Sequence, residues 1–168
     1  MKNVEIVRIF REIAYLIQIA ENDPNTIYKV RAYDRAADVI ENMSTELEEI
    51  YSKSGIKGLR KIPSIGNAIS SKIEEFIKLH KIAYHEELTT KVPINISEFY
   101  NLRGIGPMTL KILYEKLKIT SISQLEKAAS EGSIKRIKGF SKMKEDNILR
   151  VIQLSKQNKG RYLLGDVY

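Results

Sequence analysis

Apolar side chains recur every three or four positions along most of the chain. Near the N-terminus the pattern runs from Val4 to Ala20, and a second stretch from Ile27 to Ile40 repeats it. This spacing puts the apolar side chains on one face of an α-helix, so each stretch predicts an amphipathic helix. Asn22-Asp23-Pro24 separates the two helices, and Asp23 or Thr26 is expected to cap the second.

The same helical period continues to the end of the chain. A third helix is expected around residues 47–51, with Ser44 or Thr45 as its cap, followed by a short lead-in over 56–61. Further helices are predicted over 69–77, 84–90, 108–117, 121–130 and 142–158. No stretch alternates with a period of two, and only Arg161-Tyr162-Leu163-Leu164 could be extended. The pattern therefore predicts an all-α fold.

Composition agrees with an ordinary globular protein. The chain is 43% hydrophobic and 29% charged, within the usual range for soluble domains. It contains no cysteine, which excludes disulfides, a thiolate nucleophile and a thiolate metal site. No apolar run approaches the roughly 18 residues that a membrane helix needs, and no signal peptide is expected before the first helix. We therefore expect a cytoplasmic protein with no membrane partner.

Charge is distributed unevenly along the chain, whose formal net charge is +7. Residues 1–52 hold six Lys or Arg against ten Asp or Glu, a net of −4. Residues 53–168 hold 22 against 11, a net of +11. A basic segment of this length favours a polyanionic partner such as nucleic acid, although many lysine-rich proteins are basic without binding one.

A short motif is repeated in the chain. Ile62-Pro63-Ser64-Ile65-Gly66 and Leu102-Arg103-Gly104-Ile105-Gly106 lie 40 residues apart, and each reads apolar, variable, small, apolar, glycine. A hydrophobic residue follows eight positions after the central isoleucine in both, at Ile73 and Leu113. Ile137-Lys138-Gly139-Phe140-Ser141 is a weaker third copy. We expect a helix before and after each motif, and call the three motifs the first, second and third hairpins.

The motif suits close contact with a phosphate. A small residue permits a tight turn and a close approach of the backbone to a ligand. The first N–H groups of the following helix lack intrahelical partners and lie at the positive end of the helix dipole. Such a group of amides binds phosphate readily. We therefore predict sequence-neutral, salt-sensitive binding to a DNA backbone. Plain helix–helix turns, or hairpins that contact another protein, are the alternatives.

These residues resemble the helix-hairpin-helix class, and more narrowly the N-terminal part of the family X DNA polymerases. The stretch from Tyr28 to Ala37 looks like the family's aromatic-basic helix, and the first and second hairpins look like its two hairpins. The resemblance implies a lyase-like lobe at 1–90 and a helical DNA-binding lobe at 91–160. It also implies that a palm domain would begin at 161–168.

The resemblance implies binding to gapped or nicked DNA and to 5′-phosphorylated ends. The first hairpin would hold the downstream strand at a gap, and the second the primer strand. The expected DNA contacts are Lys29, Tyr33, Ser64, Gly66, Asn67, Lys72, Arg103, Gly104, Gly106, Met108, Lys111, Gly139 and Lys142. No cofactor is required, but Na⁺ or K⁺ is expected at the hairpins. The cation would be held by the backbone carbonyls of Arg60, Ile62 and Ile65, and of Tyr100, Leu102 and Ile105.

Two enzymatic activities can be compared with the family pattern. Lys72 aligns with the lysine that forms a Schiff base with an abasic sugar in some members, a role that needs a neutral amine. Ala68 and Tyr84 stand where that pattern has basic residues, so Lys72 could equally be a surface lysine in a phosphate grip. Polymerisation needs carboxylates that hold two metal ions. No Asp-x-Asp occurs here, so this chain alone is not expected to polymerise DNA.

Overall fold

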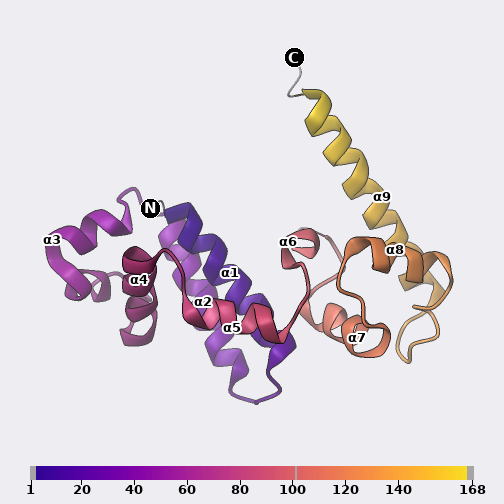
Figure 1. Ribbon diagram of the computed structural model, residues 1–168, viewed down its shortest axis with the longest axis horizontal. Helices are drawn as coiled ribbons and strands as arrows, with labels where there is room; N and C mark the ends of the chain where they lie inside the picture. The colour runs from indigo at the N-terminus through magenta and orange to yellow at the C-terminus, as the bar shows by residue number, and fades with distance from the viewer. Residues whose placement is uncertain (1–2, 101, 166–168) are drawn as a thin grey trace. The chain divides into compact units, whose positions relative to one another are not determined.

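The computed structural model describes residues 3–100 and 102–165, with side chains to residue 158, and its regular secondary structure over these residues is entirely helical (Figure 1). The helices are α1 (Asn3–Ala20), α2 (Thr26–Glu41), α3 (Leu47–Arg60), α4 (Asn67–Leu79), α5 (Ala83–Lys91), α6 (Ile96–Phe99), α7 (Pro107–Leu117), α8 (Ile122–Ser130) and α9 (Lys142–Gly165). Among the described residues there is no β-strand, so the all-α prediction is confirmed. The chain divides into two compact units, Met1–Val92 and Pro93–Tyr168.

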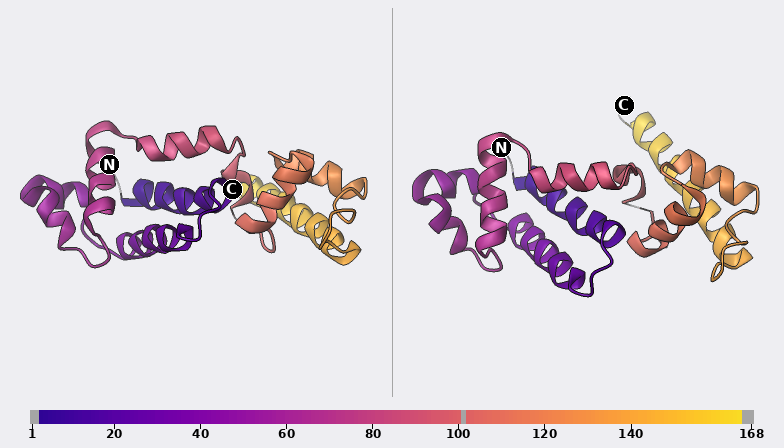
Figure 2. Two further views of the ribbon diagram at one scale, coloured as in Figure 1. Left: turned by 90° about the horizontal axis from the view of Figure 1, so that it is seen from below. Right: turned by 60° about the horizontal axis from the view of Figure 1, so that its bottom comes forward.

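The core of the first unit is built around α1. This helix lies between α2 and α5, which pack along two of its sides (Figure 2). Phe10, Ile13 and Leu16 on α1 are fully buried. The Phe10 ring meets the buried Tyr33 ring of α2 edge to face, with the centroids 5.4 Å apart. Because two neighbours cover α1, its apolar surface is wider than a single stripe.

A buried asparagine joins the start of α1 to the start of α3. The Asn3 side chain donates from Nδ2 to the carbonyl of Thr45 at 2.9 Å and accepts the Leu47 N–H at 2.8 Å. The Leu47 N–H is one of the first amides of α3, which have no partner within the helix. Asn3 therefore supplies a cap from a distant part of the chain, and its loss would leave a buried donor without a partner.

α3 is bent where it approaches the first hairpin. Gly55 has φ 64° and ψ −159°, so the chain turns sharply between the first part of α3 and the segment that ends at Arg60. The predicted lead-in over 56–61 corresponds to this second part. Tyr51 before the bend donates its hydroxyl to Glu74 of α4 at 2.9 Å, which ties α3 to α4.

The second unit contains α6 to α9. Its fully buried side chains include Phe99, Leu110, Leu113 and Leu125, and α8 packs along α9. Ser121 caps α8 by accepting the Gln124 N–H at 3.3 Å, as its position in the sequence predicts. Glu98 of α6 accepts the Ile122 N–H at 2.9 Å, so α6 is fixed to the start of α8.

Some details of the predicted pattern are wrong. Val4 is 76% exposed and Ile27 is 46% exposed, because each lies in the first turn of its helix at the edge of the core. The predicted caps of α2 and α3 are not found. The residues before these helices are Asn25 and Glu46, and neither makes a side-chain capping bond. Residues 161–164 are not extended, since α9 continues to Gly165 without a helix-breaking proline. None of the described helices is long and apolar enough to cross a membrane.

Replacing Asn3 by alanine should destabilise the first unit by about 1–3 kcal/mol, because the buried Leu47 N–H loses its acceptor. Urea unfolding followed by circular dichroism measures the change. Asn42→Ala is the matched control. Its exposed side chain donates to the Asp38 carbonyl, and its loss should cost about 0.5 kcal/mol or less. Equal effects of the two substitutions would contradict the role assigned to Asn3.

Candidate nucleic-acid interface

The first hairpin is a tight turn between α3 and α4. The Ile65 N–H donates to the Ile62 carbonyl at 3.1 Å and closes a four-residue turn. Ser64, its third residue, has φ 67°, in the left-handed region that favours glycine. Pro63 before it and a positive φ at the third position are the features of a type II turn. The serine therefore adopts a glycine-like backbone.

The second and third hairpins place a glycine at the position of Ser64. Gly104 has φ 80° and Gly139 has φ 90°. In the third hairpin the Phe140 N–H donates to the Ile137 carbonyl at 3.0 Å, the same turn bond as in the first. The three motifs thus share a positive φ at the same position as well as a sequence pattern.

The third hairpin departs from the pattern on its N-terminal side. Turns occupy residues 131–136, so no helix leads directly into this hairpin, contrary to the prediction. Ser141 at its end accepts the Lys144 N–H at 3.1 Å and caps α9. The buried carboxylate of Glu145 accepts the Lys135 N–H at 2.9 Å. These contacts hold the turn against α9 in place of a preceding helix.

One buried side chain fixes each turn to the helix that follows it. The central residues Ile65, Ile105 and Phe140 are all at most 7% exposed. The residues eight positions later, Ile73, Leu113 and Ile148, are buried as well. The hairpins are therefore held by the core while their small residues stay at the surface, as the repeat predicts.

The space beside the hairpin glycines is open. Gly66 and Gly106 precede α4 and α7 with φ −91° and −93° and extended ψ values, a conformation open to any residue. A Cβ added at either would meet no described atom within 4 Å beyond its chain neighbours. Neither backbone conformation nor internal packing explains these two glycines. The open space would allow an external group to approach the backbone closely at both positions.

Most of the predicted contact residues lie at the surface of these hairpins. Ser64, Gly66, Asn67, Arg103, Gly104, Gly106, Met108, Gly139 and Lys142 are exposed, while Lys72 and Lys111 are half-buried. Met108 is 57% exposed in the first turn of α7.

The two units differ in net charge. Met1–Val92 holds 14 basic and 14 acidic residues, whereas Pro93–Tyr168 holds 14 basic and seven acidic residues. The whole net charge of +7 therefore belongs to the second unit.

Ser70 supports the first hairpin and was not predicted. It is fully buried, its hydroxyl donates to the Asn67 carbonyl at 3.0 Å, and it accepts from Arg60 Nε at 3.4 Å. Arg60 at the end of α3 is thereby joined to the first turn of α4. A serine in a helical apolar pattern carries no signal of such a contact, so sequence reasoning had no means of finding it.

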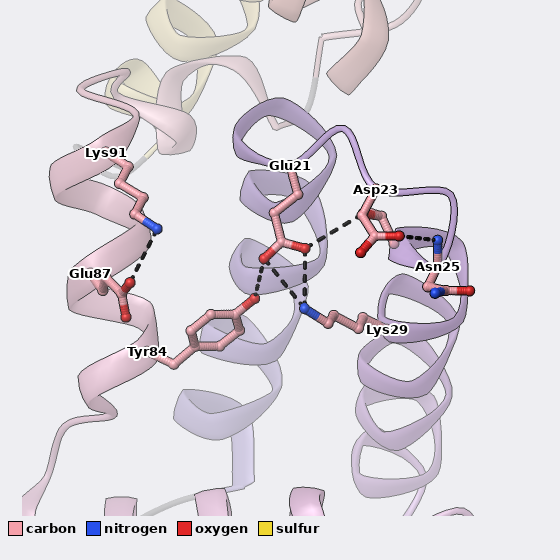
Figure 3. A network of polar contacts seen from close by, with 8 residues as sticks. Glu21, Asp23, Asn25, Lys29, Tyr84, Glu87 and Lys91 are labelled. Carbon is pink, nitrogen blue, oxygen red and sulfur yellow. Dashed lines mark hydrogen bonds and ion pairs between the residues drawn. The ribbon is translucent and has the colours of Figure 1, made fainter.

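Three predicted contact residues, Lys29, Tyr33 and Lys72, lie close together in the first unit. We call Glu21, Lys29, Tyr33, Lys72 and Tyr84 the Glu21 cluster. Lys29 Nζ lies 3.2 Å from the Glu21 carboxylate, and the Tyr84 hydroxyl donates to it at 2.9 Å (Figure 3). Lys72 Nζ lies 5.4 Å from the centre of the Tyr84 ring, a cation–π contact. Tyr33 lies beside Tyr84, with the ring centroids 6.4 Å apart.

Glu21 makes this cluster less favourable to an anion than its lysines alone. Burial raises the pKa of Tyr33 to about 12, and the negative charges of Glu75 and Glu21 act in the same direction. Burial and the hydrogen bond to Glu21 raise the pKa of Tyr84. Both hydroxyls therefore stay protonated at neutral pH, as donors beside a carboxylate. Glu21 was missed because it lies 63 positions from Tyr84.

The predicted cation sites depend on backbone carbonyls. The Ile62 carbonyl already accepts the Ile65 N–H, so it retains one lone pair for a cation. Among the described residues, no group of three His, Asp or Glu could hold a metal ion. The Na⁺ or K⁺ site at the hairpins thus remains a prediction that these carbonyl oxygens permit.

Comparison with known families agrees with the hairpin geometry. Residues 1–82 match a family described as a helix-hairpin-helix domain, and the first hairpin lies inside that range. A helix-hairpin-helix domain is thus found in the first unit, and the general function that it supports is DNA binding without sequence preference. No curated protein matches the chain.

Ser64→Gly should stabilise the first unit by roughly 0.5–1 kcal/mol. The left-handed conformation costs a non-glycine residue about 1–2 kcal/mol, and glycine removes this cost. Part of the gain is lost, because glycine has more conformational entropy in the unfolded chain. The reverse change in the second hairpin, Gly104→Ser, should destabilise the second unit by about 1 kcal/mol. Thermal and urea unfolding of both variants measure the shifts. Changes of the same sign would show that the two turns are not equivalent.

Proposed function

We propose that the protein binds DNA through its backbone phosphates, using the amides at the starts of α4 and α7. The observation that carries this proposal is the open, sterically unexplained glycine before each helix. The exposed amides behind such a glycine can reach a phosphate oxygen that a side chain would keep away. Contacts to phosphates carry no base information, so binding is sequence-neutral.

We further propose that the DNA is gapped or nicked, and that the chain acts as the N-terminal part of a family X-like repair polymerase. Each of the two units carries a hairpin that ends in an open glycine directly before a helix, Gly66 in the first and Gly106 in the second. Two separately folded units can hold the two duplex segments that flank a gap. The sequence resemblance supports this assignment because it extends over both units, and a palm domain would be the partner that supplies polymerisation.

Gly66→Leu and Gly106→Leu should each weaken DNA binding at least about tenfold, because the new side chain occupies the approach of a phosphate. Their stability should change by about 1 kcal/mol or less, since leucine can adopt both backbone conformations and only the N-cap preference is lost. Fluorescence anisotropy with a gapped duplex measures binding. The slope of the logarithm of affinity against the logarithm of salt concentration should decrease by about the amount expected for one lost phosphate contact.

Ala32→Leu is the matched control, since it adds the same side chain at an exposed position of α2, a helix that is part of neither hairpin. It should leave affinity and salt slope unchanged. Undiminished binding by both glycine variants would overturn the proposal. Loss of self-association or of a protein contact, with DNA binding intact, would instead establish the protein-interaction alternative.

Lyase activity through Lys72 is the second candidate, favoured by its half-buried position in the Glu21 cluster. Attack on an abasic sugar requires Lys72 to lose a proton and to leave the Tyr84 ring that its ammonium now contacts. Glu21 also holds the Lys29 ammonium, which could otherwise bind the sugar's phosphate. Both contacts oppose the reaction.

Borohydride trapping on DNA with a 5′-deoxyribose phosphate end tests this activity. We expect no more covalent adduct with the unaltered protein than with Lys72→Ala, because the Lys72 ammonium contacts the Tyr84 ring and the Lys29 ammonium is paired with Glu21. Lys78→Ala is the control, since Lys78 is an exposed lysine of the same helix, 3.9 Å from Glu74. An adduct that persists in Lys78→Ala and disappears in Lys72→Ala would establish the lyase.

A further inference from the structure

The helices that follow the three hairpins begin in the same register. In each of α4, α7 and α9, the N–H of the fourth helical residue donates to the carbonyl of the residue before the helix. The distances are 2.9 to 3.1 Å, and the pairs are Ser70 with Gly66, Leu110 with Gly106, and Glu145 with Ser141. Corresponding positions can therefore be compared directly. The third hairpin differs from the other two in the groups that would meet an anion.

Ser141 takes up an amide that the other two hairpins leave uncapped. Its hydroxyl oxygen accepts the N–H of Lys144, the third residue of α9, at 3.1 Å. Gly66 and Gly106 stand at the same position before α4 and α7, and neither has a side chain that could cap the helix. The side chain of Ser141 also occupies the place where an added Cβ would find open space at both glycines. A phosphate at α9 would therefore have to displace a capping bond that the protein already makes.

Glu145 supplies a negative charge at the start of α9. Its carboxylate is only 4% exposed, lies in the first turn and accepts the Lys135 N–H at 2.9 Å. The corresponding residues of α4 and α7 are Ser70 and Leu110, and neither helix has an acidic residue in its first turn. A carboxylate here interacts favourably with the positive end of the helix dipole, as a bound phosphate would. Because it also repels a second anion, Glu145 opposes phosphate binding at this helix.

Two lysines that flank the third hairpin have neighbours within the second unit. Lys144 Nζ lies 4.4 Å from the centre of the Phe140 ring, a cation–π contact. The end of the Lys135 side chain lies against Gly132, where an added Cβ would come within 3.1 Å of Lys135 Cε. Both lysines are therefore already engaged by the protein itself.

We infer that Ser141 and Glu145 close the third hairpin to phosphate, so that the DNA backbone is bound by the first and second hairpins alone. These two side chains thus decide which hairpins take part in binding. Gly139 and Lys142, which the sequence predicts as DNA contacts, belong instead to a turn that braces α9. The inference rests on the proposed function, because it concerns the same kind of phosphate contact.

Opening the third hairpin tests the inference. Ser141→Gly removes the cap, and Glu145→Gln removes the charge while keeping an acceptor for the Lys135 N–H. The opened variant, which carries both substitutions, should bind a gapped duplex about threefold to tenfold more tightly by fluorescence anisotropy. The slope of the logarithm of affinity against the logarithm of salt concentration should become steeper by about the amount expected for one phosphate contact.

Ser121→Gly combined with Glu126→Gln is the matched control. Ser121 caps α8 by accepting the Gln124 N–H at 3.3 Å, and Glu126 of the same helix pairs with Lys156 at 2.6 Å. The control makes the same changes of side chain and net charge at a helix that follows none of the three hairpins. It should leave the salt slope unchanged and raise affinity less than about twofold. Thermal unfolding of both double variants checks that the second unit remains folded.

A titration of the unaltered protein with inorganic phosphate examines the three helices separately and needs no substitution. The backbone amide NMR signals of residues 67–69 and 108–109 should shift, because these amides lie at the starts of α4 and α7. The signals of residues 142–144 should stay in place. In the opened variant they should shift as well.

The outcomes separate this inference from the proposed function. Signals of 142–144 that shift in the unaltered protein as far as those of the other two helices overturn the inference, and so does the absence of a shift at all three. If the unaltered protein binds gapped DNA, an equal gain in the opened variant and the control, or no gain in either, also overturns it. Failure of the unaltered protein to bind gapped DNA overturns the proposed function, and the phosphate titration then still decides whether the third hairpin is closed.

Discussion

Burial of the central hydrophobic residue of each hairpin is the constraint on which the rest of the interface depends. Ile65 and Ile105 must enter the core directly after a turn residue with positive φ and directly before a helix. This arrangement leaves the small residues and the first helical amides at the surface. The apolar contact therefore orients polar backbone groups outward, which a loop held only by its own hydrogen bonds could not do as rigidly.

The elements that sequence predicted best are those set by local spacing. The helical period located α1, α2, α5 and α7, and the repeated motif located the hairpins with their buried residues at Ile73 and Leu113. Such features depend on residues within one or two helical turns. The period failed at Val4, because this residue lies in the first turn of α1 at the edge of the core.

Contacts between distant residues could not be predicted in the same way. Asn3 caps α3 from 44 positions away, and Glu21 meets Tyr84 across 63 positions. A resemblance can identify Lys29, Tyr33 and Lys72 as neighbours, but it does not show which carboxylate lies among them. That carboxylate changes the chemistry of the site, because the lysines on which a phosphate or an abasic sugar would depend already have partners.

The two units differ in the electrostatics they bring to DNA. The second unit carries the whole net charge of +7, so long-range attraction to phosphates arises there. Its hairpins also have glycine at the positive-φ position. The first unit has no net charge, and it holds its lysines against carboxylates and a tyrosine ring. The two units therefore differ in how their basic side chains are placed to attract phosphates, because Lys29 and Lys72 of the first unit already have partners in Glu21 and Tyr84.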